Sequence, residues 1–189
     1  MSYTSQEAFY FYWHCTTAAL LIEKLEHNTA TNSHIRHAIR MASETARGKL
    51  GVQYASRDAL ARKPVDSSRW SGLDLVREHV VPVSVISKRV MDAHGDRLTY
   101  TWRELLGHLT QEDMNNWQIL DSDYFLDRSA DFSAVVAAIV RQWTVLAWVT
   151  KEEDKRLRKA GLTKSMPIGS EGKEQLSRYK ACGIELVSI

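Results

Sequence analysis

Residues that break secondary structure are rare along this chain. Its 189 residues include only three prolines and nine glycines, the residues that most often end helices or force turns. Long helices should therefore dominate, and a chain of this length can bury one sizeable core. We expect a mainly α-helical fold with a small β component, organised as a single domain over residues 1–189.

Composition excludes several classes of protein. Apolar residues make up 44% and charged residues 25% of the chain, as in a soluble globular domain. The longest apolar stretch, residues 133–150, is interrupted by Arg141 and Gln142, so we expect no transmembrane helix and no membrane partner. The N-terminal run MSYTSQEAFYFYWHC lacks the basic start of a signal peptide, and Cys15 and Cys182 are too few for a disulfide scaffold. We therefore expect a cytoplasmic protein.

Charge is balanced overall but uneven locally. The net charge is only +2, which excludes a strongly cationic protein that coats nucleic acid. Residues 151–164 nevertheless hold six Lys or Arg side chains against three acidic ones. This segment fits either contact with phosphate groups or a solvated helix face.

Residues 1–62 form a helical N-terminal part in this interpretation. The spacing of apolar residues predicts three helices, over residues 6–27, 34–50 and 57–62. The TATNS run at residues 29–33 offers caps for the second helix. The first helix carries Phe9, Trp13 and Leu20 and is aromatic on more than one face, so it lies at the centre of the core or forms half of an interface.

Residues 74–189 mix helices with short strands. We expect a strand that ends in EHVVP, and helices that follow Pro82, Thr101 and Thr110. A helix over residues 132–143, a strand over 145–149, a short helix through Tyr179 and a terminal IELV strand complete the pattern. Thr150 with Glu153 three residues later is a capping box that opens a helix over residues 151–160, and Gly161 suits its C-terminal end.

The run REHVVPVS at residues 77–84 places a carboxylate beside an imidazole. EHVVP resembles the first motif of the His-Me finger (HNH-type) nucleases, and is especially similar to the EHVVPA run of the bacterial endonuclease I family. The resemblance implies that His79 ends a strand and acts as general base on the attacking water. It also implies that Glu78 helps to bind one divalent metal, within a strand, strand and helix unit enclosed here by a helical domain.

The chemistry of phosphodiester hydrolysis suits these two residues. Imidazole can accept a proton from water near neutral pH, and a carboxylate oxygen suits Mg²⁺ or Mn²⁺, which neutralises charge on the phosphate. Neighbouring residues on a regular strand point to opposite faces. Glu78 and His79 can therefore share one site only if the strand ends or twists between them.

A second metal ligand is needed, and two positions compete for it. In the run VLAWVTKEEDKRL a strand leads into a helix, which would present Glu153 or Asp154 on its first turns. The family more often has Asn or His at that position. The other candidate is Asn116 in MNNWQIL, which matches the Asn-aliphatic run in the middle of many HNH sequences. We prefer the first arrangement.

Two functions remain open from the sequence. In the first, the protein is an endonuclease that hydrolyses DNA with one Mg²⁺ or Mn²⁺, with RNA as a second substrate left open, and Arg77, Lys155 and Arg156 contact the phosphate backbone. In the second, it is an interaction or nucleic-acid-binding module without catalysis. Its aromatic first helix would then bind a protein partner or a second copy of the chain.

Overall fold

The computed structural model describes residues 5–25, 28–63, 70, 74–95, 132–170 and 174–189. Within these residues the protein is mainly helical with one four-stranded mixed sheet, which confirms the expected mainly α class with a small β component. No helix in this part of the chain is both long enough and apolar enough to cross a membrane. The helices expected after Thr101 and Thr110 lie outside the described residues.

The chain forms two compact units, each built from two separate stretches. Unit 1 comprises residues 1–49 and 86–143, and unit 2 comprises residues 50–85 and 144–189. Neither unit corresponds to the ranges 1–62 and 74–189 that the sequence distinguishes.

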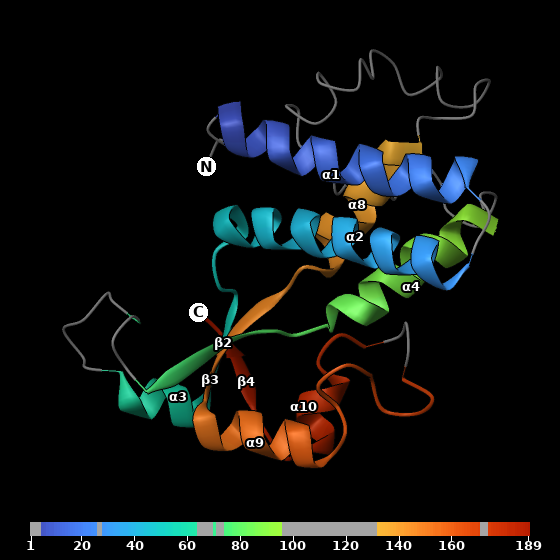
Figure 1. Ribbon diagram of the computed structural model, residues 1–189. Helices are drawn as coiled ribbons and strands as arrows, with labels where there is room; N and C mark the ends of the chain where they lie inside the picture. Colours follow the sequence, from blue (N-terminus) through green and yellow to red (C-terminus); the bar gives the residue numbers. More distant parts are fainter. Residues whose placement is uncertain (1–4, 26–27, 64–69, 71–73, 96–131, 171–173) are drawn as a thin grey trace. The chain divides into compact units, whose positions relative to one another are not determined.

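The described part of unit 1 is helical (Figure 1). Its described elements are α1 (Ser5–Lys24), α2 (Thr29–Leu50), most of α4 (Val83–Gly95) and α8 (Phe132–Trp143). Helices α1 and α2 run in opposite directions, and α8 packs against α1. Nine consecutive residues of α8, from Phe132 to Val140, are buried, as expected for a helix enclosed on all sides.

Helix α1 buries a different face from the one that its large side chains suggest. Phe11, Cys15, Ala18 and Ile22 are buried and recur at helical spacing, so they form one stripe along the helix. Phe9, Trp13 and Leu20 are instead exposed, by 58%, 59% and 50%. The apolar pattern in the sequence therefore marked the outer face of this helix.

Helix α2 begins earlier than the sequence predicted. The TATNS run lies inside the helix, because the cap is Asn28, whose Oδ1 accepts a hydrogen bond from the Thr31 N–H at 2.9 Å. The predicted start at residue 34 was five residues too late, because Asn28, directly before the run, is also a good cap and is the one used.

Unit 2 contains the sheet. Its elements are β1 (Tyr54–Ser56), α3 (Arg57–Arg62), β2 (Leu75–His79), β3 (Leu146–Thr150), α9 (Lys151–Lys159), α10 (Ser177–Ala181) and β4 (Leu186–Ser188). The strand order is β2-β3-β1-β4. The central pair, β1 and β3, is parallel, and the two outer strands are antiparallel to their neighbours.

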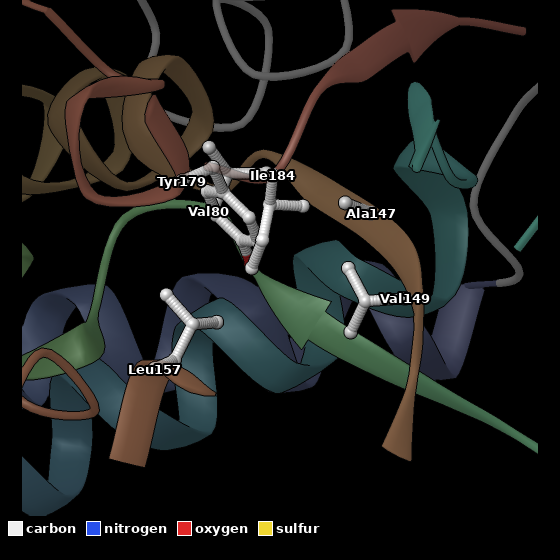
Figure 2. Close-up of a cluster of buried hydrophobic side chains, with 6 residues drawn as sticks. All are labelled: Val80, Ala147, Val149, Leu157, Tyr179 and Ile184. Carbon is white, nitrogen blue, oxygen red and sulfur yellow. The ribbon is translucent and has the colours of Figure 1, made fainter. Parts of the chain in front are cut away.

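A small apolar cluster holds unit 2 together. Figure 2 shows its six buried side chains converging: Val80, Ala147, Val149, Leu157, Tyr179 and Ile184. They come from β3, α9, α10 and the segments that flank β2 and β4, so α9 and α10 are anchored to the sheet through their apolar residues. This cluster fixes where the polar side chains of the same elements lie.

Candidate functional site

The strand that carries Glu78 and His79 pairs with a second strand, and that second strand leads into the helix that carries Glu153 and Asp154. Strand β2 pairs antiparallel with β3, with Glu78 opposite Ala147 and His79 opposite Leu146. Helix α9 begins at Lys151, directly after β3. The three elements therefore follow in the order strand, strand, helix, although a long stretch of chain separates the two strands.

The two residues of the motif face opposite sides of the sheet along this ladder. Val76 and Val80 both pack in the apolar cluster of unit 2, so the alternation of side chains assigns Glu78 to the same face and His79 to the other, with Arg77. The strand ends at His79, and a bend follows at residues 80–81. Glu78 and His79 can share a site only around this end of the strand.

The sequence interpretation missed Arg178, the largest fully buried side chain in the described part of the chain. Its Nε donates to the Val80 carbonyl at 2.9 Å and its Nη1 to the Leu162 carbonyl at 2.9 Å. Its Nη2 donates to the His79 carbonyl, to Glu78 Oε2 at 3.3 Å and to the Tyr179 hydroxyl at 3.1 Å. No local signal in the sequence identifies a buried arginine, because its partners are distant in sequence.

Asp154 belongs to the same neighbourhood as Glu78. Its side chain is only 6% exposed and accepts a hydrogen bond from Arg158, one turn further along α9. That bond, followed by the charge of Asp154 and a smaller contribution from Glu78, raises the pKa of Arg158 above its usual value. We call Glu78, Asp154, Arg158 and Arg178 the carboxylate–arginine cluster.

The pKa of Tyr179 responds to both carboxylates. Burial raises the pKa of its hydroxyl from 10.0 to about 12. The negative charges of Glu78 and Asp154 add to this rise, while the charge and hydrogen bond of Arg178 oppose it. Both carboxylates therefore act electrostatically on one buried phenol of unit 2.

Glu153, the alternative to Asp154, has a structural role in this arrangement. Its Oε2 accepts hydrogen bonds from the Ser56 hydroxyl at 2.6 Å and the Thr150 N–H at 2.8 Å. The Glu153 N–H donates in turn to Thr150 Oγ1 at 3.2 Å, which confirms the predicted capping box. Glu153 therefore ties the start of α9 to β1. Asn116 lies outside the described residues.

The three cations expected on the phosphate backbone are spread over unit 2. Arg77 is exposed on the sheet face opposite Glu78, and Lys155 is exposed on α9. Arg156 is also exposed, and it donates to the Cys182 carbonyl at 3.4 Å and lies 3.9 Å from Asp58. Of the basic side chains on α9, Arg158 rather than these lies in the carboxylate–arginine cluster.

The donor atoms of the cluster suit a hard, hydrated cation. Among the residues that the structure describes, no three His, Cys, Asp or Glu side chains gather around one point, so the candidate protein ligands are two carboxylates. Mg²⁺ is commonly bound by one or two carboxylates and completes its shell with water and substrate phosphates. Glu78, with 24% of its side chain exposed, and Asp154 are the two carboxylates that could hold such an ion.

Known proteins add no counterpart. No protein-family model, no curated protein and no solved structure matches this chain. No family is assigned on these comparisons, and the likeness of EHVVP to the His-Me finger motif stays a resemblance of sequence.

Proposed function

We propose that the protein is a metal-dependent endonuclease that hydrolyses phosphodiester bonds of DNA, and that β2, β3 and α9 act as its His-Me finger-like unit. One observation carries the proposal. The antiparallel pairing of β2 with β3 sets α9 beside the strand of the motif, so that Glu78 and Asp154 belong to one cluster. In this proposal, the sequence motif and a separate helix each contribute one carboxylate to the metal site.

In this proposal each residue has a distinct role. Glu78 and Asp154 hold Mg²⁺ or Mn²⁺, which when bound neutralises charge on the phosphate. His79 accepts a proton from the attacking water at the end of β2. Arg77, Lys155 and Arg156 contact the phosphate backbone. Both cysteines remain thiols, in keeping with an enzyme of the reducing cytoplasm.

Arg158 has to move for this chemistry to occur. It is the hydrogen-bond partner of Asp154, and a metal ion on that carboxylate would compete with it for the same oxygen. The Arg158 side chain is 64% exposed, so it can swing into solvent at low cost. Once displaced, it adds a further cation beside the phosphate.

The test is cleavage of plasmid DNA with Mg²⁺ or Mn²⁺ by the wild type and the single variants His79→Ala, Glu78→Gln and Asp154→Asn. Each variant should lose at least about 10²-fold in rate, the usual range for a general base or an electrostatic contact. Glu152→Gln is the matched control, because Glu152 lies on the same helix, pairs with Arg62 at 2.9 Å and is outside the cluster. It should cleave like the wild type.

The proposal fails if the wild type is inert on both DNA and RNA with either metal. It also fails if Asp154→Asn retains full activity while Glu152→Gln does not.

An interaction module is the second candidate, and the exposed face of α1 favours it. Phe9 and Trp13 are stacked with ring centroids 6.1 Å apart, and both side chains are more than half exposed together with half of Leu20. Large exposed apolar side chains on one helix face are typical of a contact surface. An inert wild type that self-associates in sedimentation, with the association lost in Trp13→Ser, would support this function instead.

A further inference from the structure

Arg178 has a fully buried guanidinium that donates hydrogen bonds to three consecutive residues at the end of β2. Its exposed fraction is 1%, and a buried cation persists only where its donors are satisfied. Here three of its partners are Glu78, His79 and Val80. These are the first three residues of the EHVVP motif.

These contacts hold a bend in the backbone at the end of β2. Successive carbonyls along a β-strand point to opposite sides of the strand. Arg178 nevertheless binds the carbonyls of both His79 and Val80, while the Val80 N–H donates to the Val145 carbonyl at 2.7 Å. The chain must therefore leave the extended conformation between residues 79 and 80, and a rigid planar fork of donors holds it there.

We propose that Arg178 is a positioning residue, whose guanidinium fixes the bend at the end of β2 and thereby sets the His79 imidazole relative to the Glu78 carboxylate. This inference rests on the proposed nuclease function for its catalytic consequence. One guanidinium thus binds both the Glu78 carboxylate and the His79 backbone, the two residues that the reaction needs together.

Two other partners show what Arg178 is attached to. The Leu162 carbonyl follows α9, and the Tyr179 hydroxyl belongs to α10. The guanidinium thus connects the end of β2 to the helix that carries Asp154. A shift of this connection would move His79 and Glu78 against Asp154, and displacements of about 1 Å can cost about 10²-fold in rate.

The test compares Arg178→Lys with Tyr179→Phe. Lysine keeps the charge but carries all of its donors on one nitrogen, so it cannot span the three carbonyls and the carboxylate that the three guanidinium nitrogens reach. Phenylalanine removes one contact of the same guanidinium and leaves all contacts to residues 78–80 in place, which makes it the matched control. Arg178→Gln, which buries no charge, replaces the lysine variant if that variant does not fold by circular dichroism.

The first measurement needs neither metal nor DNA. In protein labelled with ¹³C at histidine Cε1, the His79 signal is assigned by its loss in His79→Gln. We expect this signal to move or broaden in Arg178→Lys and to stay near its wild-type position in Tyr179→Phe. Equal behaviour of the two variants, or an unmoved signal in both, would overturn the positioning role.

The second measurement is cleavage. We expect kcat to fall about 10²-fold in Arg178→Lys with KM within about twofold, and to fall less than about threefold in Tyr179→Phe. A purely structural role predicts losses that follow stability in both variants and would overturn the inference. If the wild type does not cleave, the nuclease proposal fails, and the histidine signal still decides whether Arg178 sets the position of His79.

Discussion

The two units use arginine in different ways. In unit 1, the guanidinium carbon of Arg89 lies 3.6 Å from the centroid of the Trp143 ring, and that of Arg141 lies 4.4 Å from the Phe11 ring. In unit 2, Arg178 instead donates to three backbone carbonyls and a carboxylate. A cation over a ring tolerates sliding and rotation, whereas a fork of hydrogen bonds specifies where the backbone lies.

Buried charge follows the same division. Among the described residues, the charged side chains that are buried are Glu153, Asp154 and Arg178, and all three belong to unit 2. Unit 1 buries apolar side chains with a few hydroxyls, as in the continuous buried run of α8. Buried charges are costly unless they are paired, and they gather where a fold performs chemistry. The two units therefore differ in where their described residues bury charge.

The largest effect should come from removing the hydrogen-bonded arginine. Arg178→Met leaves Glu78 and three carbonyls without their donor, and breaking a buried ion pair typically costs about 3–5 kcal/mol. We expect this loss in the opening free energy of the β2 and β3 peptides, measured by hydrogen–deuterium exchange with mass spectrometry. A loss below about 1 kcal/mol would mean that Arg178 stabilises unit 2 no more than a cation–π contact stabilises unit 1.

An intermediate effect is expected from Tyr179→Phe, and it depends on pH. The folded state holds the pKa of Tyr179 near 12 against 10.0 in the unfolded chain, so the unfolded state releases its proton first. The stability linked to this phenol is therefore complete below pH 10 and is lost as the pH rises from 10 to about 12, by about 2–3 kcal/mol.

The Phe variant lacks this loss. Near pH 9 it should be less stable than the wild type by about 1 kcal/mol, the value of one hydrogen bond, and the order should reverse above pH 11. Urea unfolding at a series of pH values checks this. Parallel curves for the two proteins would show that Tyr179 ionises normally.

The smallest effect should come from unit 1. Arg141→Met removes the cation above Phe11, a contact worth about 0.5–1 kcal/mol, while its methylenes and the apolar surroundings of α8 are largely kept. Thermal unfolding measures the loss, and Arg141→Lys, which restores a cation, should recover part of it. If Arg141→Met lowered the free energy of unfolding as much as Arg178→Met, the two arginines would stabilise the protein equally.

Local signals predicted the parts of unit 2 that depend on local chemistry. The Thr150–Glu153 capping box fixes the start of α9 through bonds between residues three apart, and the structure confirms it. Helix α3 of the same unit and helix α8 of unit 1 match the predicted ranges. Strand β1 was missed, because three residues show no alternation and are extended only through pairing with β3 and β4.

The candidate site was predictable only in part, for a related reason. The motif identified Glu78 and the capping box led to Asp154, yet the choice between Asp154 and Glu153 required knowing that Ser56 lies beside Glu153. The role of Arg178 could not be predicted from the sequence. Its partners at residues 78–80 are about a hundred positions away along the chain.

The pairing of β2 with β3 has a consequence for how the protein is made. The stretch 86–143, which belongs to unit 1, must leave the ribosome before β3 and α9 exist to meet β2. Closing so long a loop adds little to the entropic cost of the folded state, since that cost grows only with the logarithm of length, but contacts of this range form late in folding. If the proposed function holds, a half-synthesised chain carries His79 without Asp154 or Arg178, and hydrolysis would begin only once synthesis has passed α10.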